Sequence, residues 1–441
     1  MHLSLGQRLA LGLYSLVLRI AFPVTLYHLI WRGMRQREYL LRWSERYALP
    51  TADRLRLDGC LWVHAVSVGE VLAARPLVDA LLARYPERPM LVTTITPTGS
   101  ERVRALWGDR VHHQYLPYDL AGMVRRFLDA TKPALAVIVE TEIWLNLYVE
   151  CGRRGIPLAM VNARLSERSL RGYLPVRWLA RLALRAVRLV AAQSQADAAR
   201  LARIGAEPDR IVTTGNLKYD LRLPEGLAAR AAEWRAAWGE SRPVWIAAST
   251  HAPEEEAVLA LREQVAARFP EALLLWAPRH PERFGPVRAA LAERGLRVAT
   301  RRSHGLPGAD TQVFVIDTIG ELLGFFAAAD VAFVGGSLCE VGGHNVLEPA
   351  ALGVASVVGP HTFNFAEVTQ RLRDGGALLQ AADATALGEA LVALLADPAR
   401  RRAMGDAGRA QVAELSGALA RTLELLAPML ERNGERGTRN E

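Results

Sequence analysis

The chain has 441 residues, 51% of them hydrophobic, and a formal net charge of +8 at pH 7. This length exceeds what one ordinary hydrophobic core serves, so we expect two domains of roughly 200 residues each. The positive charge favours anionic partners, such as phosphates, nucleic acid or an acidic membrane surface. The chain has three widely spaced cysteines, which argues against a disulfide framework and against a cysteine-based zinc site. So few cysteines are typical of a protein in a reducing compartment.

The N-terminal segment has the composition of a membrane anchor. Leu9–Trp31 is an apolar run long enough to cross a bilayer, interrupted only by Arg19 and His28. Five arginines follow between residues 32 and 46, so the positive-inside rule places the rest of the chain in the cytoplasm. No small-residue cleavage site follows, which argues against a removed signal peptide. We predict a membrane-anchor helix over residues 1–32. A helix lying on the membrane surface and a buried amphipathic helix remain alternatives.

The segment Leu61–Glu70, LWVHAVSVGE, predicts a buried strand, a turn and the start of a helix. Two roles are open for Glu70. With Ser67 it fits the capping box S-x-x-E, in which the carboxylate only satisfies backbone N–H groups. Alternatively, it lies beyond the carboxyl end of a strand, where α/β proteins bind ligands, and is placed to take a proton from a bound hydroxyl.

Apolar runs then alternate with helical patterns, which predicts βα units and parallel sheets. The pattern lapses near residue 222, so we expect two domains, at 33–221 and 222–430, followed by a disordered tail at 431–441. The predicted strands are residues 61–66, 90–94, 134–139, 158–161, 189–192, 211–213, 244–248, 272–276, 313–316, 331–334 and 355–358. The predicted helices include residues 71–84, 123–130, 178–186, 254–268, 287–294, 322–329 and 347–352.

Polar loops follow several strands of the first half. Thr93–Ser100 offers hydroxyl groups at the start of a helix, which suits anions or sugar hydroxyls as well as simple capping. Glu140 and Glu142 follow one strand end, and Lys218 follows another. Lys218 is placed either to neutralise developing negative charge or to serve as the structural partner of Glu140.

The loops of the second half are richer in phosphate-binding features. Arg279 follows a strand end, and its guanidinium can bind a phosphate through two parallel N–H bonds. Gly320 lets backbone approach a ligand closely. Within the glycine-rich stretch Val334–Pro349, a helix is predicted to begin near Asn345 with its positive end toward the site. Glu348 lies in the first turn of this helix, where a carboxylate suits ribose hydroxyls or a base amino group.

Several classes of function are disfavoured. The chain has no G-x-x-x-x-G-K-[ST] and no G-x-G-x-x-G after its first strand, which argues against P-loop ATPases and dehydrogenases. It has no G-x-S-x-G, so it fails the simplest test for an α/β-hydrolase. The histidines are scattered, which argues against a metal site. The arginines are dispersed through predicted helices rather than forming a stripe, which argues against nucleic acid as a partner.

Ten motifs in chain order resemble one family. They are WVHAVSVGE, TTITPTGSERV, LPYD, ETEIW, NARLSERS, GNLKYD, PVWIAASTH, APRHPERF, FVGGSLCEVGGHNVLEPA and GPHTFNF. Together they resemble the 3-deoxy-D-manno-octulosonic acid (Kdo) transferases of lipopolysaccharide assembly over nearly the whole chain.

The resemblance implies an α/β GT-B fold, in which two Rossmann-like doubly wound domains face each other across a cleft. It implies inverting transfer of Kdo from CMP-Kdo to a lipid A precursor (lipid IVA), without a metal or any cofactor besides the donor. The N-terminal domain then binds the acceptor and the C-terminal domain binds the CMP-sugar. The protein is expected at the bacterial inner membrane, with its catalytic domains on the cytoplasmic face.

The resemblance also assigns residues. Glu70 matches the general base of the family, and Glu140 and Lys218 match positions that support the transition state. The positions that match the CMP contacts are Pro278, Arg279, Ile319, Gly320, Glu321, Asn345, Val346, Leu347 and Glu348.

The sequence departs from the family pattern at two places. Leu145 stands where Pro usually follows the Trp of the E-T-E-x-W run, and Val346 replaces the usual Pro of H-N-P-L-E. Because Pro stiffens a helix start, the Val346 change is expected to affect donor affinity rather than activity as such. Another GT-B enzyme that uses a UDP-sugar, either a transferase or an epimerase, is the alternative among enzymes.

Overall fold

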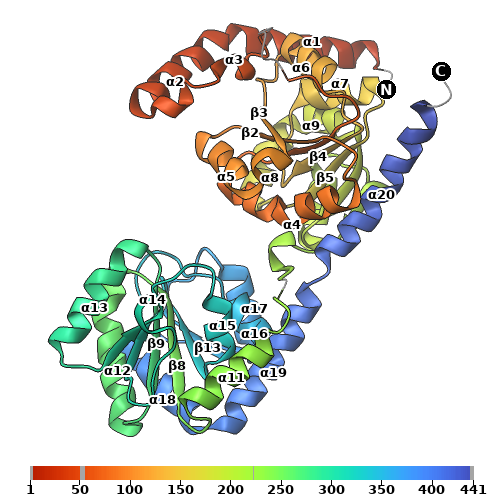
Figure 1. Ribbon diagram of the computed structural model, residues 1–441. Helices are drawn as coiled ribbons and strands as arrows, with labels where there is room; N and C mark the ends of the chain where they lie inside the picture. The colour runs from red at the N-terminus through yellow and green to blue at the C-terminus, as the bar shows by residue number, and fades with distance from the viewer. Residues whose placement is uncertain (1–2, 50–54, 222, 438–441) are drawn as a thin grey trace. The chain divides into compact units, whose positions relative to one another are not determined.

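The structure is a computed structural model that describes residues 3–49, 55–221 and 223–437, with side chains described up to residue 431. It divides into two units (Figure 1). Unit 1 comprises Met1–Asp220 and Ser416–Glu441, and unit 2 comprises Leu221–Leu415. Each unit is built on one seven-stranded sheet in which all neighbouring strands run parallel.

The sheet of unit 1 has the order β3-β2-β1-β4-β5-β6-β7. In its centre, Leu61 of β1 stands opposite Met90 of β2 and Leu135 of β4. These central strands are apolar and buried on both faces, as parallel sheets require. The strands are β1 Leu61–His64, β2 Met90–Thr94, β3 His112–Tyr115, β4 Leu135–Val139, β5 Leu158–Ala163, β6 Val187–Ala192 and β7 Ile211–Thr213.

Helices cover both faces of this sheet. One face packs against α6, α7, α9 and α10, and the other packs against α4, α5 and the C-terminal helix α20. The helices of unit 1 after the N-terminal pair are α3 Trp43–Arg46, α4 Val68–Arg84, α5 Pro97–Trp107, α6 Ala121–Thr131, α7 Leu145–Arg154, α8 Glu167–Tyr173, α9 Arg177–Leu184, α10 Gln195–Ile204 and α20 Ala418–Gly437.

The sheet of unit 2 has the order β10-β11-β9-β8-β12-β13-β14. Trp245 of β8 and Trp276 of β9 lie fully inside its core, on the face covered by α12, α13 and α18. The opposite face packs against α11 and α15. The strands are β8 Val244–Thr250, β9 Leu273–Pro278, β10 Val298–Thr300, β11 Val313–Val315, β12 Val331–Val334, β13 Ala355–Val358 and β14 Leu378–Gln380. The helices are α11 Leu227–Trp238, α12 Glu255–Arg268, α13 Phe284–Glu293, α14 Arg301–His304, α15 Leu322–Ala327, α16 Leu347–Leu352, α17 Ala366–Asp374, α18 Ala384–Ala396 and α19 Pro398–Leu415.

The predicted alternation of strands and helices is confirmed, but three strands were not predicted. These are β3, β10 and β14, and each lies at the edge of its sheet. An edge strand pairs on one side only and is short, so it needs fewer apolar residues. The sequences HHQY, VAT and LLQ therefore carry little of the apolar signal on which the prediction rested.

The C-terminal segment corrects the predicted domain ends. The division after Asp220 lies close to the predicted boundary, but residues 416–430 belong to unit 1 rather than to the C-terminal domain. Asp220 accepts hydrogen bonds from the N–H groups of Gly417 and Leu419, and so it caps the start of α20. Residues 431–437 continue α20 as helix, so the predicted disordered tail is wrong there. Residues 438–441 lie outside the described part.

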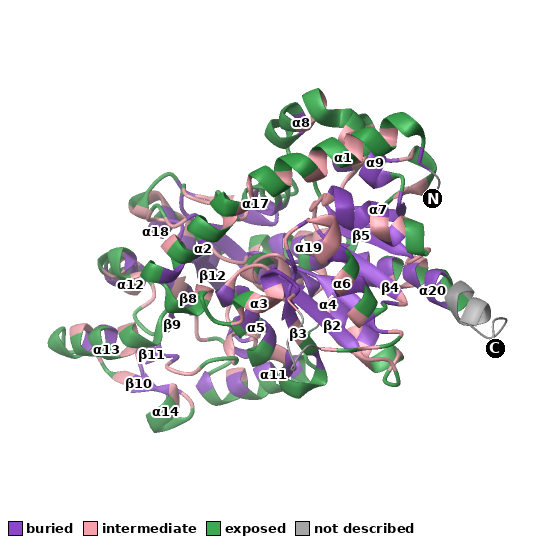
Figure 2. Ribbon diagram, turned by 90° about the horizontal axis from the view of Figure 1, so that it is seen from above, coloured by how far each residue is buried: buried purple, intermediate pink, exposed green. Residues whose placement is uncertain are grey.

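The N-terminal segment is not one helix. α1 (Leu5–Ile20) and α2 (Phe22–Arg35) are bent by 44° at Ala21. Pro23 explains the break, because proline lacks the N–H group that a continuous helix would need. Within the described residues no single helix is long and apolar enough to cross a membrane, although the bent pair reaches that length and composition together. Figure 2 shows both helices with long exposed stretches.

Candidate active site

The strand order of unit 1 places Glu70 and Glu140 at its switch point. From β1 the chain proceeds to β2 and β3 on one side and then returns to β4 on the other side. In open α/β sheets, ligands bind beyond the carboxyl ends of the two strands at which this reversal occurs. Glu70 lies in the first turn of α4, which follows β1, and Glu140 directly follows β4.

The Glu70 carboxylate does not form the predicted capping box. Its Oε2 accepts a hydrogen bond from the N–H group of Val66 over 2.5 Å, one residue before the helix cap. Ser67 is the N-cap residue of α4, but within the described structure its hydroxyl caps no N–H group. The second oxygen, Oε1, accepts no hydrogen bond from any described residue. Glu70 is therefore held by one oxygen and keeps the other available.

The environment of Glu70 shifts the pKa of its carboxyl group. Its pKa is raised to about 7, chiefly by burial, and the nearby negative charges of Glu140 and Glu142 contribute to this rise. The Val66 hydrogen bond and the Lys218 cation act in the opposite direction. A group with a pKa near the working pH exists in both protonation states, which is the condition for efficient proton transfer.

Glu140 and Lys218 form an ion pair, with 3.2 Å between Lys218 Nζ and Glu140 Oε1. The backbone of Glu140 is left-handed, with φ of 61°, a conformation that costs a residue with a side chain about 1–2 kcal/mol. Its N–H group bonds to Val161 O over 2.9 Å, so β5 holds this turn in place. The pair thus fixes a cation and an anion beside Glu70.

The switch point of unit 2 lies between β8 and β12, because the chain reverses direction there. Glu254 joins the loops that follow these two strands. Its buried carboxylate accepts N–H bonds of 2.7 to 3.0 Å from His251, Gly336, Ser337 and Leu338. All of these bonds are intramolecular, so Glu254 supports the loops rather than a ligand.

Two glycines after β12 allow the loops to pack closely. A Cβ atom on Gly335 would lie 2.8 Å from Thr250 Cα, which is too close for a side chain. Gly336 has φ of 68°, and a Cβ atom there would lie 2.8 Å from the His344 ring. The glycines that the sequence suggested as ligand-binding therefore have a packing role as well.

Two histidines that the sequence reasoning did not select meet at this point. His251 Nε2 and His344 Nε2 are 2.8 Å apart, and their rings are nearly parallel. Burial, together with the Arg279 cation, lowers the pKa of His344 to about 4, and burial also lowers the pKa of His251. Both rings are therefore neutral at neutral pH, and Arg279 remains the cation beside them. The signal for His251 was its position directly after an apolar strand.

Pro278 and Arg279 lie at the end of β9, which extends two residues beyond the predicted strand end at Trp276. Pro278 is the last residue of β9, and the N–H group of Arg279 bonds to Thr250 O over 2.9 Å. The Arg279 side chain is exposed. Its charge acts on Glu348 as well as on His344, which places these groups near one another.

Ile319, Gly320 and Glu321 form the turn before α15. Ile319 is 82% exposed, and Gly320 has φ of 92°. The Glu321 carboxylate is engaged by the Arg301 guanidinium, which holds the pKa of Glu321 below its ordinary value. Among the described residues, no hydrogen bond or ion pair joins this turn to Arg279. Glu321 is thus neutralised within the protein and offers a ligand little free charge.

The segment Asn345–Glu348 begins α16. Asn345 donates from Nδ2 to Glu348 Oε1 over 3.0 Å and accepts the N–H group of Leu347 at Oδ1. Burial raises the pKa of Glu348. Val346 is the N-cap residue with φ of −88°, not far from the range that proline adopts, and Leu145 is the first residue of α7, where proline is also accepted. Both departures from the family pattern fit their backbone positions.

No group of three or more His, Cys, Asp or Glu side chains in the described ranges is arranged to hold a metal ion.

Comparisons with known proteins identify the chain. Residues 41–221 match the family model of 3-deoxy-D-manno-octulosonic-acid transferase (kdotransferase), and residues 307–411 match that of glycosyl transferases group 1. The chain is 40% identical to the 3-deoxy-D-manno-octulosonic acid transferase of Haemophilus influenzae, over 95% of this chain and 99% of the relative. It is 41% identical to the transferase of the same name from Bordetella pertussis, over 95% of this chain and 99% of the relative.

Among solved structures, UDP-GlcNAc 2-epimerase from Neisseria meningitidis has the same fold, with a TM-score of 0.54. The match covers 84% of this chain and 99% of that one at 14% identity, so it bears on the fold alone. The sequence relatives decide the family. The chain belongs to the 3-deoxy-D-manno-octulosonic acid (Kdo) transferases, glycosyltransferases of lipopolysaccharide biosynthesis.

Proposed function

We propose that this chain transfers Kdo from CMP-Kdo to the lipid A precursor lipid IVA, with inversion at the anomeric carbon and with Glu70 as the general base. The observation that carries the proposal is the Glu70 carboxylate, which lies at the switch point of unit 1 with a pKa raised to about 7. One of its oxygens is anchored by the Val66 N–H group. The geometry leaves the other oxygen to take the proton.

In the proposed step, an acceptor hydroxyl loses its proton to Glu70 as its oxygen attacks the anomeric carbon. The bond from that carbon to the CMP phosphate oxygen breaks, and CMP leaves with the bonding electron pair. Lys218 and Glu140 support the transition state, and their ion pair supplies fixed charges beside Glu70. In-line attack by a single hydroxyl inverts the anomeric centre.

Unit 2 is proposed to hold the donor. Arg279 and the backbone around Pro278 would bind the CMP phosphate, and the turn at Ile319–Glu321 would contact the nucleotide mainly through backbone, because Arg301 occupies the Glu321 carboxylate. Asn345, Val346, Leu347 and Glu348 would complete the CMP site. Arg279 provides the cation for the departing phosphate, so the proposal needs neither a metal nor a further cofactor.

The proposal is tested with the purified full-length protein, CMP-Kdo and lipid IVA in detergent micelles. We expect mass spectrometry to detect lipid IVA carrying added Kdo, and NMR to show a product with the anomeric configuration opposite to that of the donor. A product of retained configuration would contradict the inverting step. Turnover of UDP-sugars without any turnover of CMP-Kdo would contradict the proposed donor.

We also propose that α1 and α2 attach the protein to the cytoplasmic face of the bacterial inner membrane by lying on it. One face of α1 is docked on unit 1, where Tyr14 donates to Asp119 Oδ2 and Ser15 donates to Asn146 Oδ1, each over 3.0 Å. A different face is apolar and exposed, and it consists of Leu5, Leu9, Leu13, Leu16, Val17 and Ile20. A helix docked along its length in this way presents its apolar face to a membrane surface.

The charges of this segment agree with a surface location. On a helix of 3.6 residues per turn, Arg8 and Arg19 fall between the docked face and the apolar face of α1. Both are exposed, as are Arg32 and Arg35 of α2. An amphipathic helix with cations at the border of its apolar face binds anionic lipid surfaces without spanning the bilayer.

A vesicle flotation experiment tests this attachment. Replacing both Leu9 and Leu13 by Glu is expected to weaken binding to vesicles that contain phosphatidylglycerol by at least about 10-fold, because each buried leucine contributes roughly 1.5–3 kcal/mol. The matched control is Val176→Glu, which adds a charge at an exposed apolar residue of unit 1 outside these helices. Unchanged flotation of the double variant, or an equal loss in the control, would contradict the proposed mode of attachment.

A further inference from the structure

The turn at the end of β5 carries an unusual asparagine beside the Glu140–Lys218 pair. Asn162 lies in a bulge, because the register of β5 with β6 shifts between Met160 and Ala163. Its φ is 54°, a left-handed conformation that redirects the side chain. Leu217 donates its N–H group to Asn162 Oδ1 over 3.0 Å. Asn162 therefore contacts the segment that carries Lys218.

The Asn162 amide retains an unused donor. The side chain is 1% exposed, and its Nδ2 has no hydrogen-bond partner in the part of the chain that the structure describes. The bond from Leu217 fixes Oδ1 as the acceptor, so the unpaired group is the NH2 with two hydrogens to donate. Buried polar groups are nearly always paired. This donor at the edge of the sheet is thus left by the chain for an acceptor from outside it.

Arg164 follows two residues later, and its backbone is fixed on both sides. Thr141 Oγ1 donates to Arg164 O over 2.5 Å, and Leu165 donates its N–H group to Asp197 Oδ1 over 2.9 Å. The guanidinium of Arg164 is exposed, and it forms no hydrogen bond or ion pair with any described residue. The structure therefore fixes the backbone of this residue, while its positive charge stays unpaired among the described residues.

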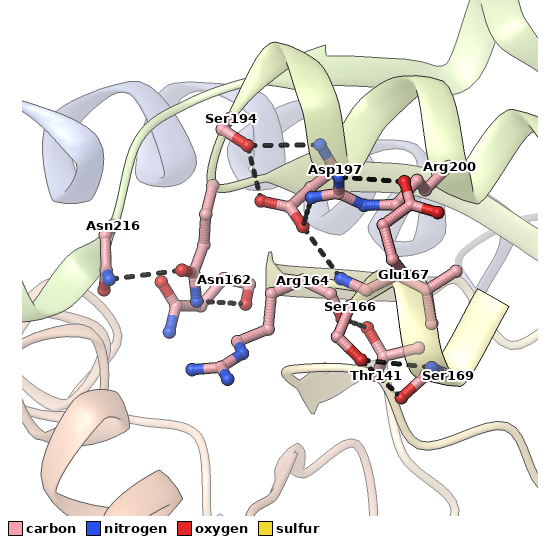
Figure 3. A network of polar contacts seen from close by, with 12 residues as sticks. Thr141, Asn162, Arg164, Ser166, Glu167, Ser169, Ser194, Asp197, Arg200 and Asn216 are labelled. Atoms are coloured by element: carbon pink, nitrogen blue, oxygen red, sulfur yellow. Dashed lines mark hydrogen bonds and ion pairs between the residues drawn. The ribbon is translucent and has the colours of Figure 1, made fainter. Parts of the chain in front are cut away.

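The neighbouring charges are already paired. Arg200 binds Asp197 over 3.0 Å and Glu167 over 3.5 Å, and Lys218 pairs with Glu140. In Figure 3 the guanidinium of Arg164 and the amide nitrogen of Asn162 extend to the same side, away from the Asp197 network. These two side chains together present donors and one positive charge, with no carboxylate of that network free to oppose them.

We propose that Arg164, with the Asn162 amide beside it, binds a phosphate monoester of the acceptor glycolipid. This inference rests on the proposed function, in which the acceptor is a lipid A precursor that carries phosphate groups on its disaccharide. A guanidinium binds the oxygens of a phosphate through two parallel N–H bonds, so it sets both position and orientation. Arg164 would then fix the disaccharide so that one hydroxyl reaches Glu70.

The test compares acceptors with and without phosphate, using the full-length protein and CMP-Kdo. For Arg164→Gln we expect the KM of lipid IVA to rise at least about 10-fold, as is typical for losing a hydrogen bond between charged groups. The KM of CMP-Kdo should stay unchanged. With dephosphorylated lipid IVA, Arg164→Gln and the wild type should have the same KM. For Arg164→Lys the KM of lipid IVA should lie between those of the wild type and Arg164→Gln, because lysine keeps the positive charge but cannot form two parallel N–H bonds to the phosphate.

The matched control is Arg168→Gln, which removes an exposed arginine from the neighbouring helix α8. Equal acceptor KM values for wild type and Arg164→Gln would overturn the inference. It would be overturned too if the effect persisted fully on the dephosphorylated acceptor, or if it appeared in the KM of CMP-Kdo. If the wild type transferred no Kdo at all, the proposed function would fail instead, so the two failures are distinguishable.

Discussion

Glu70→Gln is expected to lower kcat for Kdo transfer by at least about 100-fold, because general-base catalysis by a positioned side chain typically contributes 10²–10⁴-fold. Glutamine has nearly the same shape, and its amide oxygen can still accept the hydrogen bond from Val66. It cannot take a proton from the acceptor hydroxyl. The measurement is the initial rate with saturating CMP-Kdo and lipid IVA, together with binding of CMP by calorimetry, which should be unchanged.

Ser67→Ala is the matched control for this experiment. Ser67 precedes Glu70 in the apparent capping box, but among the described groups its hydroxyl caps no N–H. The control should therefore retain nearly the wild-type rate and unfolding temperature. A Glu70→Gln variant with the wild-type rate would reduce Glu70 to a structural partner of the Val66 N–H group.

Arg279→Ala is expected to weaken CMP binding by at least about 10-fold, since hydrogen bonds to a charged group contribute roughly 1.5–3 kcal/mol. Its side chain is exposed at the end of β9, beside two histidines whose neutral rings supply no charge at neutral pH. Arg279 is thus the cation that this group of residues would provide for the donor phosphate in the proposed function. Calorimetric titration with CMP measures the loss directly, without the transfer reaction.

The control for Arg279 is Arg294→Ala. Arg294 pairs with Glu256 at the surface of unit 2 and has no place in the proposed site. It should bind CMP as the wild type does. If Arg279→Ala bound CMP normally, or raised the KM of lipid IVA as much as that of CMP-Kdo, Arg279 would have to be removed from the donor site.

The sequence predicted the centre of each sheet well and the edges poorly. β2, β12 and β13 have the predicted bounds, because an apolar run of defined length is the direct signature of a strand buried on both faces, and among the edge strands only β7 was predicted with its observed bounds. Edge strands lack that signature. The join between α20 and unit 1 was beyond sequence reasoning, since it depends on Asp220 meeting residues about 200 positions later in the chain.

The candidate site, too, could be predicted from the sequence only in part. Local sequence offered two roles for Glu70, and the structure corrects the first of them, because the carboxylate accepts the Val66 N–H group while the Ser67 cap does not form. Its role as a base stays a prediction. The resemblance placed Glu140 and Lys218 in one site, and they form an ion pair. The His251–His344 contact and the unpaired Asn162 amide depend on which strands are neighbours and on backbone turns. Neither can be read from spacing along the chain.

The pH dependence of kcat/KM for the acceptor tests most directly whether Glu70 is the base. A base works only when it is deprotonated, so activity should fall as the pH drops below the pKa of Glu70. We predict that kcat/KM rises tenfold per pH unit below about 7 and levels off above it. Glu140→Gln should move the midpoint to lower pH, because Glu140 raises the Glu70 pKa, and Lys218→Met should move it to higher pH. A profile that is flat between about pH 5 and 8, or a midpoint that neither variant moves, would contradict the assignment.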